Sequence, residues 1–247
     1  PSLHSVGSVR AVNGIQVANE VPGVVEKIHF ESGDMVEAGD VLVELDAETD
    51  KAALATRKAE AERARQEFER LSNLVSRDAV SQSQFDEAKA NFDASRARVN
   101  EAQAQLRKKT IRAPFAGKTG LRLIDQGEYM ATGTPVVEIN MVDPIYVEYT
   151  IPEKHLGTVS TGDRVTVTVA AFPDRIFEGE ISAINSSVSA ESRTVRVRAT
   201  LDNEDGALRP GMFANVRTLR PEPRRAVVVP RTAVSFNTYG DFVYVIT

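Results

Sequence analysis

A repeat with a constant offset of 94 residues constrains this fold more than any other feature of the sequence. Five residues of the first copy, Gly23, Gly33, Gly39, Glu44 and Leu45, correspond without a gap to Gly117, Gly127, Gly133, Glu138 and Ile139. Each copy is typical of a strand, a glycine-containing turn and a second strand. A single copy would expose an apolar face, so we expect the two copies, at residues 14–46 and 111–140, to pack together as a small β-sandwich.

Alternation within each copy also predicts the core of this sandwich. The apolar positions of the first copy are Val24, Ile28, Phe30, Val41, Val43 and Leu45. Those of the second copy are Leu121, Leu123 and Val137. Because successive side chains of a strand point to opposite faces, we expect these residues to be buried and polar neighbours such as His29 to be solvated.

Residues 47–110, between the two copies, predict a helical hairpin. This segment contains no Gly or Pro and is rich in Ala, Glu, Arg, Lys and Gln. Two series of apolar residues recur every seven positions, Leu54, Ala61, Phe68, Val75 and Phe85, Phe92, Val99, Leu106. The second seam position holds Ala64, Leu71, Ala88 and Ala102. Pairing the two series so that residue numbers sum to 160 places the turn near Val80, which predicts an antiparallel coiled coil.

Residues 141–220, together with residues 10–13, predict a small antiparallel β-barrel. Five short strand-like stretches occur at 146–151, 165–169, 176–184, 194–201 and 212–218, with glycine-containing turns at 162–163, 203–206 and 209–211. A short helix is expected at Glu153 to Leu156, after Pro152. Several short strands at this spacing are typical of a small barrel.

Residues 1–10 and 221–247 predict part of a further β-domain. Within it, strands are expected at 226–229 and 242–246. The fold class is therefore α+β and mainly β, in an elongated multidomain chain: a β-sandwich split by a coiled-coil hairpin, a small antiparallel β-barrel, and a partial β-domain.

Composition excludes several classes of function. The chain has no cysteine, which excludes disulfides and thiolate metal sites. His4, His29 and His155 lack a carboxylate or second histidine at helical ligand spacing, and no nucleophile elbow, P-loop or dinucleotide fingerprint occurs. A net charge of −5 provides no basic excess for a phosphate backbone. We therefore expect no catalytic residues, no cofactor, no metal and no nucleic-acid partner.

The two halves of the repeat resemble the biotinyl/lipoyl module. The segment Glu48-Thr49-Asp50-Lys51-Ala52 resembles a lipoyl attachment sequence. In that family, however, the carrier lysine lies on a tight hairpin between halves that follow each other closely, whereas residues 47–110 separate them here. This position favours a solvated lysine in the first turn of a helix, and a lipoyl or biotin carrier remains the alternative from a different class.

A lipoyl-like fold split by a helical hairpin and followed by an all-β region resembles the periplasmic adaptor, or membrane fusion, proteins of Gram-negative tripartite efflux pumps. The stretches 192–197 and 208–213 are similar to signatures of the adaptor barrel. Adaptors of resistance-nodulation-division (RND) pumps carry at the hairpin tip an Arg, a Leu four residues later and a Ser seven further. Arg70, Leu74 and Ser81 have this spacing, so the resemblance implies that they dock onto the outer-membrane channel.

The resemblance also implies a function and partners. It implies a non-catalytic adaptor that links an inner-membrane RND drug/proton antiporter to a TolC-like outer-membrane channel and seals the conduit as a ring of six copies. The location would be the periplasm, with a lipid or helical inner-membrane anchor before Pro1 and a membrane-proximal domain at residues 1–10 and 221–247. An adaptor of an ABC-type exporter or a type I secretion system remains the alternative.

Each tip residue also has a local interpretation. Ser81 and Gln84 have the spacing of a capping box that would begin the second helix. Arg70 alone would be a solvated helix charge. Leu74 adjoins seam residues Leu71 and Val75 without belonging to their series, which is typical of an outward-facing residue.

Overall fold

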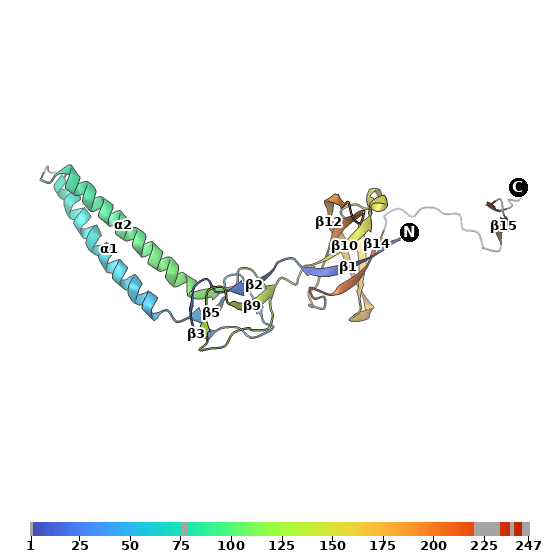
Figure 1. Cartoon of the computed structure of the whole chain (residues 1–247), viewed down its shortest axis with the longest axis horizontal. Helices are drawn as coiled ribbons and strands as arrows, with labels where there is room; N and C mark the ends of the chain where they lie inside the picture. Colours follow the sequence, from blue (N-terminus) through green and yellow to red (C-terminus); the bar gives the residue numbers. More distant parts are fainter. Residues whose placement is uncertain (1, 76–78, 220–232, 238–239, 244–247) are drawn as a thin grey trace. The chain divides into compact units, whose positions relative to one another are not determined.

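The computed structural model describes residues 2–75, 79–219, 233–237 and 240–243. They fall into two compact units. The first, Ala11–Ile145 with Asn203–Leu208, contains the β-sandwich and the helical hairpin, and the second contains the barrel (Figure 1). Within the described residues, no helix is both long enough and apolar enough to cross a membrane.

The sandwich consists of two four-stranded sheets, and each sheet combines strands from both copies of the repeat. One has the order β2 (Gly14–Ala18), β9 (Pro135–Asn140), β7 (Gly117–Thr119), β4 (Met35–Val36). The other has the order β6 (Thr110–Arg112), β5 (Val41–Leu45), β3 (Gly23–Ile28), β8 (Tyr129–Met130). The mixing of strands from both copies in each sheet confirms that the copies pack together. The two sheets bury a shared core that includes Leu42, Val43, Met130 and Val137.

Part of the predicted sandwich core was wrong. Val24 is 41% exposed, while the adjacent Val25 is 1% exposed. The β3–β5 pairing shifts register between Val25 and Lys27, and this irregularity moves the burial pattern by one residue relative to strict alternation.

The second copy departs from the prediction for a related reason. Leu121 is 79% exposed and Leu123 is 50% exposed, whereas Ile124 is buried at 3%. Strand β7 ends at Thr119, so the side chains of the following residues do not alternate between the two faces of a sheet. The predicted burial of Val137 is confirmed.

Helices α1 (Glu48–Val75) and α2 (Gln82–Lys108) form the predicted antiparallel hairpin (Figure 1). The contact between Phe68 and Phe92 agrees with the register that the heptads predicted. The side chain of Asp46 accepts a hydrogen bond from the Glu48 amide (3.0 Å) where α1 begins. The ring of Phe68 stacks on that of Phe92, with centroids 5.7 Å apart, and also contacts Phe85 at 5.5 Å. These rings hold together the half of the hairpin that is nearer the turn between α1 and α2.

Replacing Phe68 with Ala should lower the free energy of unfolding of the hairpin by about 2 kcal/mol. The change removes two ring contacts and part of the buried apolar area, but the side chain is only half-buried, so the loss is smaller than for a fully buried ring. Urea unfolding followed by ellipticity at 222 nm measures it, because α1 and α2 are the α-helices of the described chain. The exposed Gln66→Ala is the control, and equal stability of the two variants would contradict this packing.

The second unit is a closed six-stranded barrel. Its strand order is β1 (Ser2–Ala11), β10 (Ile145–Pro152), β13 (Thr194–Leu201), β12 (Phe172–Ser189), β11 (Arg164–Val169), β14 (Phe213–Leu219). Valines fill much of the interior, where the Tyr149 hydroxyl lies 3.0 Å from that of Thr218. Burial raises the pKa of Tyr149. The short helix expected after Pro152 is a 3-10 helix, η1 (Glu153–Thr158).

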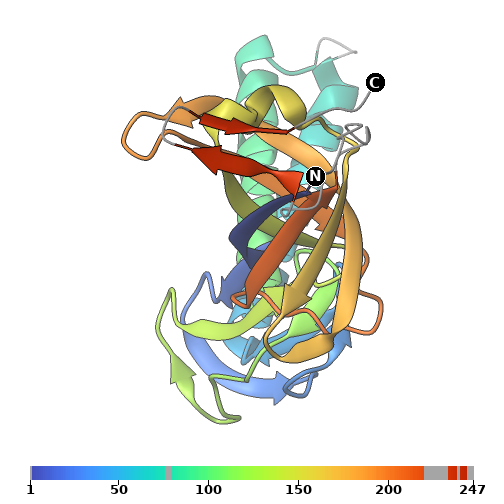
Figure 2. The same cartoon turned by 90° about the vertical axis from the view of Figure 1, so that its right-hand side faces the viewer.

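The first ten residues lie in the barrel rather than in a separate domain. Strand β1 pairs with β14 from Ser2 opposite Leu219 to Ser8 opposite Phe213 (Figure 2). Without β1 the neighbouring strands β10 and β14 would each have an unpaired edge, so β1 closes the barrel. Strands β15 (Ser235–Asn237) and β16 (Gly240–Phe242) pair with each other. The strand expected at 226–229 and most of that expected at 242–246 lie outside the described residues.

Candidate partner-binding site at the hairpin tip

Arg70, Leu74 and Ser81 lie close to the ends of the two helices where the hairpin turns. Arg70 and Leu74 are four residues apart on the last turns of α1, so they share one side of that helix. Ser81 is the residue before α2. The carbonyl of Leu74 accepts a hydrogen bond from the Ala79 amide (3.0 Å), which brings the chain back toward α2.

Ser81 caps α2, as its spacing from Gln84 predicted. Its hydroxyl accepts a hydrogen bond from the Gln84 amide (3.3 Å), and the Gln84 side chain accepts one from the Ser81 amide (3.2 Å). This reciprocal arrangement satisfies two amides that a helix start leaves without partners. Because Ser81 is also exposed, capping leaves one side of it available to a partner.

Arg70 is exposed and pairs with a carboxylate on its own helix. One guanidinium nitrogen donates to the two oxygens of Glu67, at 2.6 and 2.5 Å. An exposed pair at this spacing contributes less than about 1 kcal/mol, so a partner carboxylate can exchange with Glu67 at low cost. The solvated interpretation of Arg70 is therefore compatible with binding.

Leu74 is half-buried rather than fully outward-facing. Most of its side chain is covered by its own hairpin, and the remainder is accessible. A partly exposed leucine near the end of a helix can anchor a small interface, because docking would remove its remaining apolar area from water.

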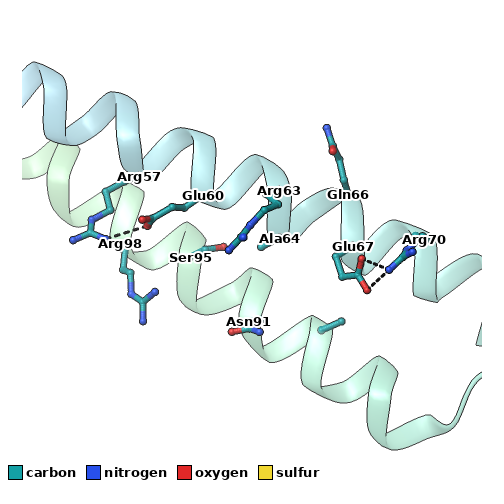
Figure 3. Close-up of a pocket in the computed structure, with 11 residues that line it drawn as sticks. Arg57, Glu60, Arg63, Ala64, Gln66, Glu67, Arg70, Asn91, Ser95 and Arg98 are labelled. Carbon is teal, nitrogen blue, oxygen red and sulfur yellow. Dashed lines mark hydrogen bonds and ion pairs between the residues drawn. The ribbon is translucent and has the colours of Figure 1, made fainter.

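A groove that was not predicted from the sequence runs along one face of the hairpin, and Arg70 also lines it. Its floor consists of the small residues Ala64, Ala88 and Ser95, and its rim carries the four arginines Arg57, Arg63, Arg70 and Arg98 (Figure 3). We call this feature the arginine groove. The sequence signal was the alanines at the second seam position, Ala64 and Ala88, beside the phenylalanines of the first seam position, Phe68, Phe85 and Phe92.

Other candidate positions show no built site. Lys51 is exposed in the first turn of α1 and pairs with Glu48 (2.9 Å), which raises the pKa of Lys51. It does not lie on a turn between strands, where a carrier lysine would be expected. His29 is partly exposed and lies 3.2 Å from Glu44. No group of His, Cys, Asp or Glu in the described part of the chain could hold a metal ion.

A sandwich divided by a helical hairpin and combined in one chain with a six-stranded barrel is the architecture of a membrane fusion protein. The family model for the barrel-sandwich hybrid domain of RND membrane fusion proteins matches residues 13–142. The model for the CusB-like β-barrel domain matches residues 144–222. The chain therefore belongs to the RND membrane fusion protein family.

A similar protein agrees with this assignment. The multidrug resistance protein MdtA of Proteus mirabilis is 31% identical over 267 residues, which cover 99% of this chain and 65% of that protein. The chain thus spans about 65% of the length of this relative.

Two solved structures share the fold. A MacA-MexA chimera that contains the Pseudomonas aeruginosa MexA α-hairpin has a TM-score of 0.78 at 22% identity, covering 88% of this chain and 80% of the chimera. The membrane fusion protein Spr0693 of Streptococcus pneumoniae R6 has a TM-score of 0.69 at 22% identity, covering 89% of this chain and all of that one (100%).

Proposed function

We propose that this protein is the periplasmic adaptor of a tripartite efflux pump. It links an inner-membrane RND drug/proton antiporter to a TolC-like outer-membrane channel, and its hairpin tip docks on the channel. The observation that carries the proposal is the tip itself, since Arg70 and Leu74 lie near the end of α1 and Ser81 lies at the start of α2. At about 1.5 Å per residue, helices of 28 and 27 residues reach about 40 Å.

The proposed mechanism is mechanical and involves no catalytic step. The hairpin acts as a spacer whose stiffness comes from its stacked rings, while the sandwich holds the two helix bases in fixed positions. The barrel would contact the transporter. Copies attached to the inner membrane would surround the conduit as a ring, for which we expect six subunits.

Crosslinking from the tip tests the docking step. Because the chain has no cysteine, Ser83→Cys introduces a single thiol in the first turn of α2 and leaves the Ser81 cap intact. In cells, a thiol crosslinker should join this variant to the outer-membrane channel. Ala59→Cys, exposed far below the tip on α1, is the control and should not capture the channel.

The captured proteins also distinguish the alternatives. Recovery of an ABC-type exporter or of a type I secretion component with the adaptor would replace the RND antiporter as its inner-membrane partner. Failure of Ser83→Cys to capture any outer-membrane channel, with the variant folded and expressed, would contradict docking at the tip.

A further inference from the structure

The two faces of the hairpin seam are packed differently. On one face Phe68, Phe85 and Phe92 stack and close the seam. On the other, the floor of the arginine groove consists of Ala64, Ala88 and Ser95, so the two helices leave a hollow between them (Figure 3). Small side chains at this position allow a further helix to approach the hairpin closely.

The arginine groove carries excess positive charge. Its rim includes four arginines but only two carboxylates, those of Glu60 and Glu67. Arg57 pairs with Glu60 (3.0 Å) and Arg70 with Glu67. Arg63 and Arg98 have no carboxylate partner among the residues that the structure describes. Two guanidinium groups are thus available to an acidic partner.

The side of α2 that faces away from α1 is complementary in charge and size. It carries the carboxylates Asp86, Asp93 and Glu101, with Ala90 and Ala97 between them, and all five residues are exposed. Successive members of this set are three or four residues apart, which places them on one side of the helix. We call this surface the α2 edge.

The carboxylates of the two helices differ in their ion pairing. On α1, Glu60, Glu62, Glu67 and Glu69 all pair with arginines of the same helix. Within the described chain, none of the three carboxylates of the α2 edge makes an ion pair. The available acidic groups and the available arginines therefore lie on different surfaces of the same hairpin.

The levels of these charges along the hairpin also match. Phe68 stacks on Phe92, so α1 and α2 residues whose numbers sum to about 160 lie at one level. If two hairpins lie side by side in the same direction, Arg70 of one is at the level of Ala90 of the other, between Asp86 and Asp93. Likewise, Arg63 is at the level of Ala97, between Asp93 and Glu101.

We propose that the arginine groove of one copy receives the α2 edge of a second copy. This inference rests on the proposed adaptor function, in which copies surround a conduit, and it names the surfaces that join them. The interface uses two different faces of the chain, so it is heterologous and adds copies in one direction until a ring closes. Its exposed charges make the association sensitive to salt.

Charge reversal on each side provides the test. Arg63→Glu with Arg98→Glu reverses the groove, and Asp93→Arg with Glu101→Arg reverses the α2 edge. In the full chain at low ionic strength, each double variant alone should self-associate at least about tenfold more weakly than the native protein, because like charges meet at every contact. An equimolar mixture should recover association. In the mixture, the reversed groove of one variant can bind the reversed α2 edge of the other, and the native groove can bind the native α2 edge. Sedimentation measures association, and circular dichroism confirms that both variants remain helical.

Disulfide trapping tests the geometry independently. Ala64→Cys with Ala97→Cys places one thiol on the groove floor and one on the α2 edge, at nearly the same level. Oxidation should produce a ladder of crosslinked copies from the double variant, whereas each single variant gives no ladder.

Two results would overturn the inference: a mixture that does not recover association, or capture of a different protein by Ala64→Cys in cells. If the tip variant Ser83→Cys still captures the channel in either case, the proposed function stands and only this interface is wrong.

Discussion

Replacing Leu74 with Glu will abolish export by the proposed pump. In the free hairpin Leu74 is half-buried, so the chain tolerates a charged side chain that can turn toward water. In the docked state the same position would be covered by the channel, and an unpaired carboxylate buried there costs about 2–5 kcal/mol of binding. Cells that carry the variant should be as sensitive to exported compounds as cells without the adaptor, at equal adaptor levels on immunoblots.

Ser72→Glu is the matched control for this prediction. It introduces the same charge two residues away on an exposed part of α1, and it should preserve resistance. Circular dichroism should show the same helicity for both variants. Normal resistance with Leu74→Glu, or equal loss with Ser72→Glu, would show that the tip leucine is not the docking contact.

Replacing Gly117 with Ala will strongly destabilise the sandwich. A Cβ atom at this position would lie 2.7 Å from the backbone oxygen of Asn140, 2.9 Å from its carbonyl carbon and 3.0 Å from a methyl group of Ile139. Two of these atoms belong to the backbone around β9, which cannot move without disturbing its ladders with β2 and β7. We expect a loss of about 3 kcal/mol in the free energy of unfolding.

The repeat supplies the control for this substitution. Gly23 occupies the equivalent position in the first copy, but a Cβ there would approach only side chains, with Leu45 Cβ and Lys109 Nζ both at 3.3 Å. Because these contacts are 3.3 Å or longer, a small shift relieves them, and Gly23→Ala should cost less than about 1 kcal/mol. Native-state hydrogen exchange of the sandwich amides measures both variants. Equal losses would contradict the crowding argument.

Features with a local signal could be predicted from the sequence. The heptads predicted the helical hairpin and its register, in which Phe68 meets Phe92 at the same level. The capping box of Ser81 and Gln84 depends on four consecutive residues. The repeat predicted a two-copy sandwich, since an unpaired copy would leave apolar surface in water.

For the candidate site, the spacing of Arg70, Leu74 and Ser81 was visible in the sequence, and their docking role remains a proposal. The arginine groove was not predicted. It depends on which small seam residues face the same side of the assembled hairpin as Arg63 and Arg98, which belong to different helices.

Tertiary structure alone decided where burial and strand pairing depart from the local sequence pattern. The register shift in β3 exposes Val24 and buries Val25, because pairing with β5 has priority over alternation within one strand. Similarly, β1 joins the barrel because β14 and β10, more than a hundred residues away, offer it two partner strands. Periodicity records which face of a segment is apolar, but hydrogen-bond pairing between distant strands determines where that segment lies, and no short stretch of sequence contains this information.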